Sequence, residues 1–191
     1  KLLHYNQDAT NKERQQGLIK TMAKSLGNEK IRVLVHSIAK GNLKPMRSGN
    51  KRSNTLKSDD FALTIQAMAT SCYDWVQLVF QHNLFADDAR VLAFTSEGNQ
   101  RAWSNYGAVS AAKAALEAII RNIALEFAPV GIKANCIQAG VTETKSFQLI
   151  PGHEQLKDAA LLRNPNNRLT RPEDVANVAY LLTTDDARWI T

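Results

Sequence analysis

Several features that mark specialised classes of protein are scarce or absent in this chain of 191 residues. Its two cysteines, Cys72 and Cys136, cannot build a disulfide framework and have no metal-ligand spacing. We therefore expect no metal site and a reducing, cytoplasmic setting. No apolar run approaches the ~18 residues of a membrane-spanning helix, and the first residues do not resemble a signal peptide. These absences predict no membrane association.

The composition is that of an ordinary compact domain. Hydrophobic residues make up 44% of the chain and charged residues 22%, which excludes a disordered or collagen-like protein. At roughly 150 residues per domain, the length predicts a single domain over residues 1–191.

Positive charge is concentrated in the first third of the chain. Residues 1–60 hold 13 Lys and Arg against 5 Asp and Glu, whereas residues 61–191 hold 11 against 13. A basic segment of this kind can bind nucleic acid, or it can be a solvated face with a basic loop. The basic residues are scattered and lack interleaved aromatics, so we expect no nucleic-acid partner.

Short apolar strands alternate with helices along the chain. A capping box at Thr10 and Glu13 predicts a helix that ends at Gly27. Strands are expected at 31–36, 90–95 and 132–139, and helices at 61–83, at 104–127 and after Pro172. Residues 40–58 read as a loop. The alternation predicts an α/β fold with a doubly wound parallel sheet, Rossmann-like, with helices on both faces.

Ligands of such sheets bind at the carboxyl ends of the strands. Tyr106 and Lys113 follow the second strand at a spacing of seven, about 20° short of two helical turns, so they share one helix face about 10 Å apart. A nearby cation favours ionisation of a phenol, which makes the pair a candidate acid–base site. Read only as structural residues, Tyr106 is a half-buried helix residue and Lys113 extends into solvent.

These residues resemble the active-site helix of the short-chain dehydrogenase/reductase superfamily. The spacing of Tyr106 and Lys113 is similar to that of its enoyl-acyl-carrier-protein reductases, because most other members place Lys four residues after Tyr, where this chain has Ser110. Further stretches agree with that resemblance: Val35–Ala39, Gly98 to Ala102, Ile132–Gly140 and Arg171–Val175. A second tyrosine of many such reductases is replaced here by Ser96.

The resemblance implies an NADH- or NADPH-dependent enzyme that reduces trans-2-enoyl thioesters in fatty-acid biosynthesis. It also implies that the N-terminal part of the Rossmann-like domain, with its glycine-rich phosphate loop, precedes Lys1. A last strand is expected to follow Thr191, so that the domain is incomplete at both ends.

Residue roles follow from the same resemblance. Tyr106, Lys113 and Ser96 are the implied catalytic residues, with Tyr106 donating to the thioester oxygen and Lys113 lowering the pKa of Tyr106. The implied cofactor-binding residues are Asp8, Ala9, Ser37, Ile38, Ala39, Lys113, Gly140, Thr142 and Thr144. The implied substrate-binding residues are Gly41, Ser96, Tyr106 and Phe147. Ser96 is alternatively a strand-end cap.

Residues 145–165 are the expected substrate lid, or alternatively an amphipathic surface helix. Its expected acyl-binding side chains are Phe147, Leu149, Ile150, Leu156, Leu161 and Leu162. The expected partner is acyl carrier protein or a CoA thioester, with Lys44, Arg47, Lys51 and Arg52 steering the acidic carrier. The resemblance also implies a homotetramer, with an interface formed by the helices at 61–83 and 104–127.

Two other functions remain open from the sequence. One is a 3-oxoacyl or other carbonyl reductase of the same superfamily, for which Ser96 would be an ordinary catalytic serine. The other is a non-catalytic scaffold or anion-binding member. The joint presence of Tyr106 and Lys113 argues against the scaffold.

Overall fold

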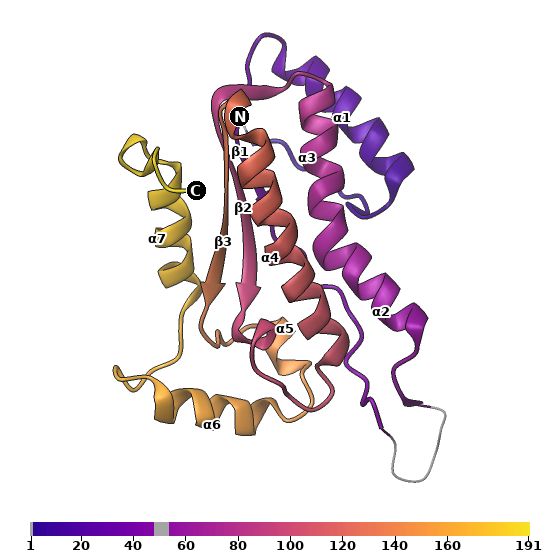
Figure 1. Ribbon diagram of the computed structural model, residues 1–191, viewed down its shortest axis with the longest axis vertical. Helices are drawn as coiled ribbons and strands as arrows, with labels where there is room; N and C mark the ends of the chain where they lie inside the picture. Colours follow the sequence, from indigo (N-terminus) through magenta and orange to yellow (C-terminus); the bar gives the residue numbers. More distant parts are fainter. Residues whose placement is uncertain (1, 48–53) are drawn as a thin grey trace.

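The computed structural model describes residues 2–47 and 54–191, and it contains three parallel strands with helices on both faces of the sheet (Figure 1). The strands are β1 (Ile31–His36), β2 (Phe85–Ser96) and β3 (Ile132–Ala139). The α-helices are α1 (Lys12–Leu26), α2 (Ser58–Ile65), α3 (Ser71–Gln81), α4 (Gly107–Phe127), α5 (Lys145–Gln148), α6 (His153–Arg163) and α7 (Pro172–Thr183). The predicted fold class is confirmed.

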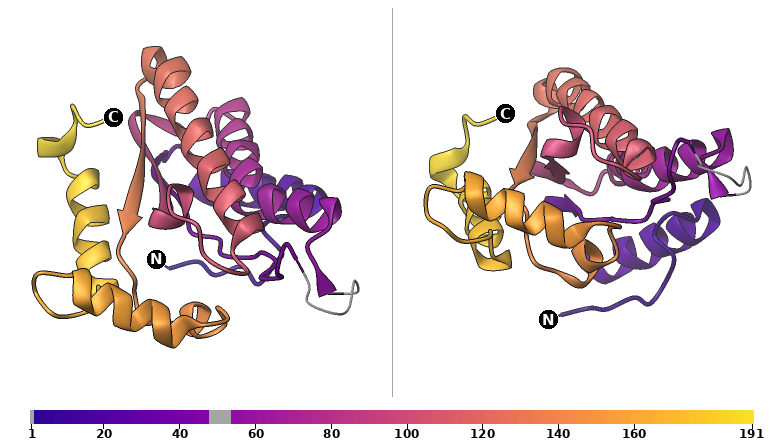
Figure 2. Two further views of the ribbon diagram at one scale, coloured as in Figure 1. Left: turned by 60° about the horizontal axis from the view of Figure 1, so that its bottom comes forward. Right: turned by 90° about the horizontal axis from the view of Figure 1, so that it is seen from below.

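Strand β2 lies in the centre and pairs in parallel with β1 on one side and β3 on the other. Its side chains alternate between two apolar layers. Val91 and Ala93 pack with α3 and α4, whereas Leu92 packs with Leu182 of α7. Both views in Figure 2 show α4 and α7 on opposite sides of the sheet. A strand covered on both faces explains the continuous apolar run in the sequence.

Helix α1 does not begin with the predicted capping box of Thr10 and Glu13. The Thr10 hydroxyl donates to the Asp8 carboxylate at 2.7 Å, and the N-cap is Asn11, whose side chain accepts from the Arg14 N–H at 3.0 Å. The charged Asp8 is a stronger acceptor than a backbone group, so it takes the Thr10 hydroxyl, and the helix starts one residue later, at Lys12.

The helix expected at 61–83 begins earlier and is interrupted. It starts at Ser58, where the Asp60 side chain accepts from the Lys57 N–H at 2.9 Å. A π-helical turn at Gln66–Thr70 then separates α2 from α3. Such turns insert a residue into a helix and are frequent near functional sites.

Helix α4 starts at Gly107, three residues after the predicted start. Asn105 has a φ of 64°, in the left-handed region, so the backbone cannot be helical there. Tyr106 is consequently the N-cap residue and precedes the helix. The predicted bounds of β3 and the predicted start of α7 at Pro172 are confirmed.

Across residues 2–47 and 54–191, none of the helices combines the length and apolar character needed to span a bilayer.

A buried arginine links the sheet to α7. Arg90 on β2 is fully buried, and its guanidinium donates to both oxygens of Asp88 and to the Leu182 carbonyl at 3.2 Å. Lys133 of β3 also pairs with Asp88, and these two cations hold the pKa of its carboxyl well below the ordinary range. The cluster joins β2, β3 and the last turn of α7.

We expect the Arg90→Ala substitution in the full-length protein to lower the free energy of unfolding by about 2–4 kcal/mol, because it leaves a cavity at a fully buried position and removes the donor of the Leu182 carbonyl. Urea unfolding followed by circular dichroism measures this. Arg188→Ala, which truncates an exposed arginine, is the matched control and should stay within about 0.5 kcal/mol of the parent. Equal effects of the two substitutions would contradict the role of Arg90.

Candidate functional site

The carboxyl ends of the strands meet at one edge of the sheet. Ser96, the last residue of β2, lies opposite Ala139 of β3, and His36 lies opposite Ala93. Figure 1 shows α5 and α6 beyond the ends to which the arrows of β2 and β3 point. This edge therefore brings together segments that are far apart in the sequence, as expected for a parallel sheet.

A cavity of about 140 Å³ lies at this edge, between the strand ends and α6, and we call it the inner cavity. It is lined by Ser96, Glu97, Gly98, Trp103, Tyr106, Ala139, Gly140, Val141, Thr142, Phe147, Ile150 and Leu156. Five of the predicted site residues line it together: Ser96, Tyr106, Gly140, Thr142 and Phe147. The other predicted catalytic and cofactor-binding residues, and Gly41, lie outside its lining.

The Tyr106 ring packs closely against the backbone of Gly98. A methyl group added at Gly98 would lie 2.5 Å from Cε1 of that ring, so only glycine fits here. Burial raises the pKa of the Tyr106 phenol, and the neighbouring Ser96 hydroxyl partly opposes the rise. The phenol is therefore protonated at neutral pH and available as a hydrogen-bond donor.

Lys113 is held by the sheet and does not line the inner cavity. It is 9% exposed, and its Nζ donates to the Phe94 carbonyl of β2 at 2.6 Å. Burial lowers the pKa of Lys113, an effect that Cys136 and Glu117 oppose. The expected lowering of the Tyr106 pKa by Lys113 is not found: Lys113 is not among the groups that shift this pKa, and burial raises it.

The Ser96 hydroxyl is shielded from solvent and makes no hydrogen bond of ordinary geometry with the described residues. Ser96 occupies the N-cap position of the 3₁₀ turn Glu97–Asn99, yet its side chain caps nothing. The strand-end cap is thus the wrong interpretation. The Ser96 hydroxyl instead lies beside the Tyr106 phenol, and a polar ligand in the inner cavity would meet both groups.

The predicted cofactor residues near the N-terminus lie beside the segment that follows β1. The Ala9 carbonyl accepts from the side chains of Gln15 at 2.7 Å and Trp75 at 2.9 Å, which fixes this turn against α1 and α3. The Asp8 carboxylate is 3.8 Å from Nζ of Lys40. Ser37 and Ala39 are exposed and Ile38 is half-buried. These residues form an accessible edge at the end of β1.

Gly41 lies against α2 and is not among the residues that line the inner cavity. A methyl group at Gly41 would lie 2.5 Å from Cγ2 of Thr64. The next residues are tied to the same helix, since Asn42 and Lys44 both donate to Asp60, at 2.7 and 2.8 Å. Lys44 is therefore part of a structural ion pair, whereas Arg47 is exposed. Lys51 and Arg52 lie outside the described residues.

The three predicted residues after β3 have different roles. Gly140 packs against the Thr170 hydroxyl, where a side chain at position 140 would clash. Thr142 lines the inner cavity, and its hydroxyl donates to the Gly140 carbonyl at 3.0 Å. Thr144 instead caps α5 by accepting from the Phe147 N–H at 3.2 Å.

The expected substrate lid contains α5 and α6, but only half of its predicted apolar residues line the inner cavity. Phe147, Ile150 and Leu156 do so. Leu149 and Leu162 are 74% and 89% exposed, and Leu161 is outside the lining, so the prediction is wrong for these three. Leu162 follows Leu156 by six residues, roughly 120° around the helix, and therefore faces another direction.

An ion pair holds α6 over the end of β2. The Arg163 guanidinium donates to both Glu97 oxygens, at 2.8 and 3.3 Å, and Glu97 directly follows Ser96. Near the middle of α6, Lys157 pairs with Glu143 at 2.9 Å.

His36, the last residue of β1, is buried and contacts the start of α3. It is 4% exposed, and its Nε2 is 2.8 Å from the Ser71 hydroxyl, which itself donates to the Ala67 carbonyl within the π-helical turn at 2.7 Å. Nε2 must therefore be the donor. Burial, assisted by the charge of Lys113, lowers the pKa of His36 from 6.5 to about 4. This contact attaches the end of β1 to the helix that packs on α4.

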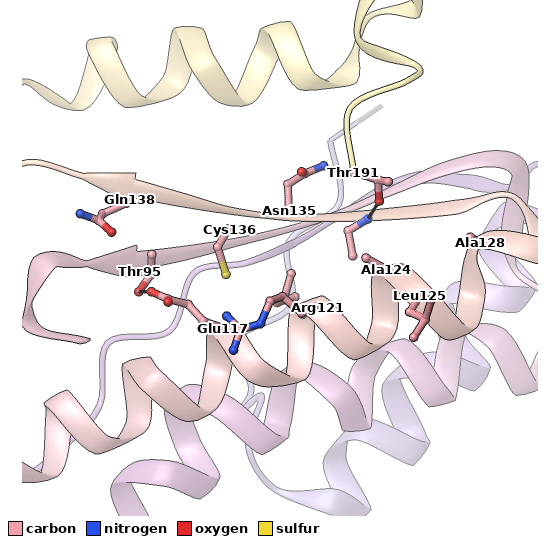
Figure 3. A pocket seen from close by; sticks show the side chains of 12 residues that line it. Thr95, Glu117, Arg121, Ala124, Leu125, Ala128, Asn135, Cys136, Gln138 and Thr191 are labelled. Atoms are coloured by element: carbon pink, nitrogen blue, oxygen red, sulfur yellow. Dashed lines mark hydrogen bonds between the residues drawn. The ribbon is translucent and has the colours of Figure 1, made fainter. Parts of the chain in front are cut away.

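A separate cavity of about 700 Å³ lies between α4 and β3 (Figure 3). Glu117 there accepts from the hydroxyl of Thr95 and the amide of Asn99, both at 2.5 Å. Burial raises the pKa of the nearby Cys136 thiol to about 11, so the thiol is unreactive at neutral pH. None of the predicted site residues lines this cavity.

Comparison with known proteins identifies a family. The model of the family described as enoyl-(acyl carrier protein) reductase matches residues 1–191. An enoyl-[acyl-carrier-protein] reductase [NADH] of Rhizobium meliloti is 29% identical over 166 residues, which cover 85% of this chain and 59% of that protein. The chain therefore spans less than two thirds of this relative's length.

Two further relatives cover nearly the whole chain. A (2S)-[(R)-hydroxy(phenyl)methyl]succinyl-CoA dehydrogenase subunit of Thauera aromatica is 28% identical, over 96% of this chain and 69% of that protein. The crystal structure of the Bacillus cereus enoyl-acyl carrier protein reductase with NADP+ and an indole naphthyridinone superposes with a TM-score of 0.85 and 26% identity. The match covers 97% of this chain and 69% of that one.

The low pKa of His36 predicts a pH-dependent stability. The unfolded chain binds a proton at His36 below about pH 6.5, whereas the folded protein does so only below about 4, so stability falls as the pH drops through this window. The loss should be about 3 kcal/mol. His36→Gln removes the titration and should reduce the loss.

Urea unfolding of the full-length protein at pH 7 and pH 4 measures this difference for the parent and for His36→Gln. His4→Gln changes an exposed histidine and should leave the difference unchanged. A parent protein and a His36→Gln variant with the same pH dependence would refute the assignment.

Proposed function

The chain belongs to the enoyl-(acyl carrier protein) reductase family, and on this basis we propose that it reduces trans-2-enoyl thioesters with NADH or NADPH. The observation that carries the proposal is the inner cavity. It brings the protonated Tyr106 phenol and the buried Ser96 hydroxyl next to an apolar wall from the segment 147–156. Two hydrogen-bond donors beside an apolar pocket suit a thioester with its acyl chain.

The accessible edge formed by Asp8, Ala9 and residues 37–39 fits one side of a dinucleotide. When bound, the nicotinamide supplies hydride to the β-carbon of the enoyl group. Lys113 uses one of its three protons on the Phe94 carbonyl, which leaves two for the ribose hydroxyls. Gly140 and Thr142 would line the part of the site that holds the nicotinamide. The Thr144 hydroxyl caps α5, so Thr144 would act on the cofactor indirectly, by positioning the start of that helix.

Tyr106 and Ser96 act on the substrate. Reduction of the double bond places negative charge on the thioester oxygen as an enolate. A hydrogen bond from the Tyr106 phenol stabilises that charge in the transition state, and Ser96 adds a second donor. The raised pKa of Tyr106 serves this role because it keeps the proton on the phenol. Phe147 closes the site over the acyl chain.

A second function has one specific observation in its favour. Ser96 stands where many enoyl reductases have a tyrosine, and the Thauera aromatica relative is named a dehydrogenase of a hydroxyl-bearing CoA thioester. A 3-oxoacyl or other carbonyl reductase would use the same Ser96 and Tyr106 on a ketone oxygen.

We expect the full-length protein to oxidise the nicotinamide with crotonyl thioester and not with acetoacetyl thioester. Tyr106→Phe should lower kcat about 10²- to 10³-fold through loss of one oxyanion donor. Steady-state assays with NADH and NADPH measure both. Tyr180→Phe, at a 73% exposed tyrosine of α7, should leave kcat unchanged.

Turnover of acetoacetyl thioester alone would instead establish the carbonyl reductase. No turnover of either substrate would favour a scaffold. An unchanged kcat in Tyr106→Phe would remove Tyr106 from the mechanism.

We also propose a cytoplasmic protein that takes its substrate from acyl carrier protein or CoA and assembles as a homotetramer. The apolar side chains Tyr73 of α3 and Leu125 of α4 are 43% and 75% exposed, which suits a helical interface between copies. Sedimentation of the full-length protein tests the tetramer.

Docking of an acidic carrier is expected to depend on Arg47. Arg47→Glu should lower kcat/KM roughly threefold for carrier-bound substrate through weaker electrostatic steering, with no change for a CoA thioester. Lys44 is unsuitable for this test because its ion pair with Asp60 is structural. Lys20→Glu on the exposed side of α1 is the control. Equal losses with both substrates would discard the docking role.

A further inference from the structure

Glu117 of α4 binds both ends of the segment that carries Ser96. Its Oε1 accepts from the Thr95 hydroxyl and from the side-chain amide of Asn99, both at 2.5 Å. Thr95 directly precedes Ser96 on β2, and Asn99 is the last residue of the 3₁₀ turn that follows it. Figure 3 shows the Glu117 carboxylate and the Thr95 side chain directed at each other. One carboxylate oxygen therefore anchors the strand end and its turn to α4.

The contact with Glu117 also fixes the orientation of the Asn99 amide. Its Nδ2 donates to the carboxylate, whereas its Oδ1 is buried and has no hydrogen-bond partner among the described residues. Rotating the amide by half a turn would place Oδ1 against the carboxylate, where two acceptors repel each other. Hydrogen bonds to a carboxylate are roughly twice as strong as those between neutral groups. Loss of Glu117 would therefore release the Asn99 end of the turn.

Gly98, which precedes Asn99 in this turn, packs against both hydroxyl-bearing side chains of the inner cavity. A methyl group added at Gly98 would lie 2.5 Å from Cε1 of Tyr106 and 3.4 Å from Oγ of Ser96. A displacement of the turn would consequently move the Ser96 hydroxyl relative to the Tyr106 phenol. Glu117 itself does not line the inner cavity, so its effect on the reaction must pass through this turn.

We propose that Glu117 is a positioning residue for the reaction. By anchoring Thr95 and Asn99, it holds the Ser96 hydroxyl at the place from which it donates to the same substrate oxygen as the Tyr106 phenol. Two donors stabilise a developing oxyanion only when both reach it, so the geometry of the turn contributes to the rate. This inference rests on the proposed reductase function.

The first test measures steady-state kinetics of the full-length protein with crotonyl thioester. Glu117→Ala should lower kcat about tenfold, because misplacement of one donor by a fraction of an ångström slows the reaction. The KM for the nicotinamide cofactor should change less than about twofold, since the cofactor does not contact the turn in the proposed site. Thr95→Val, which removes one of the two anchors and retains the shape of the side chain, should have a smaller effect.

Glu117→Gln separates position from charge. The carboxylate opposes the lowering of the Lys113 pKa, so a loss of activity could also arise through that lysine. Glutamine keeps an oxygen that can accept from both Thr95 and Asn99 but carries no charge. Its kcat should therefore stay within about threefold of the parent's. Equal losses in Glu117→Gln and Glu117→Ala would overturn the inference in favour of an effect of charge.

A double-mutant cycle with Ser96→Ala distinguishes positioning from a general structural role. Ser96→Ala alone should lower kcat at least about tenfold. In that background Glu117→Ala should cost less than about threefold, because no hydroxyl remains to be positioned. The same tenfold loss in both backgrounds would overturn the inference, as would an unchanged kcat in Ser96→Ala. If Glu117→Ala fails to fold, the same cycle with Thr95→Val provides the test.

Glu29→Ala, at an exposed glutamate between α1 and β1, is the matched control and should keep the parent's kcat. Urea unfolding confirms that each variant assayed is folded. An active parent with an unchanged kcat in Glu117→Ala would overturn the inference while leaving the reductase function intact. A parent that does not turn over crotonyl thioester would instead reject the proposed function, and the inference with it.

Discussion

The parallel pairing of β2 with a strand on each side determines where Ser96 and the carbonyl partner of Lys113 lie. Because β2 is buried on both faces, a shift of one residue would move its side chains into the wrong apolar layer. That constraint fixes Ser96 opposite Ala139 at the carboxyl edge. The same register positions Phe94, two residues before Ser96, so that its carbonyl accepts a hydrogen bond from Lys113. These two groups are thus positioned by the register of the sheet.

The electrostatics of the site follow from the same burial. Low solvent exposure disfavours the charged form of each group, so the pKa of Tyr106 rises while those of Lys113 and His36 fall. Tyr106 and His36 are consequently neutral at physiological pH. Lys113 retains a carbonyl partner and nearby acidic groups that favour its charge. Tyr106 therefore keeps its proton and can donate a hydrogen bond, whereas Lys113 is committed to the Phe94 carbonyl.

Much of this architecture could be predicted from the sequence, because apolar strands and helical periodicity are local signals. The bounds of β3 and the start of α7 at Pro172 illustrate this. The predictions fail where a hydrogen bond or a backbone conformation depends on groups that the hydrophobic periodicity does not indicate. Asp8 takes the Thr10 hydroxyl from the expected capping box, and Asn105 adopts a left-handed conformation that delays α4. In the lid, the assignment of Leu149 and Leu162 failed because an apolar composition does not specify which side of a short helix meets the cavity.

The substitution at position 96 connects the chemistry of the site to its shape. A tyrosine there would project a second ring from the end of β2 into a cavity already bounded by Tyr106 and Trp103. Serine keeps a hydroxyl at the reacting end and leaves that volume open. Trp103, on the loop between β2 and α4, also lines the cavity, and its remaining apolar lining comes from Phe147, Ile150 and Leu156. The polar and the apolar groups of the cavity are therefore supplied by separate segments of the chain.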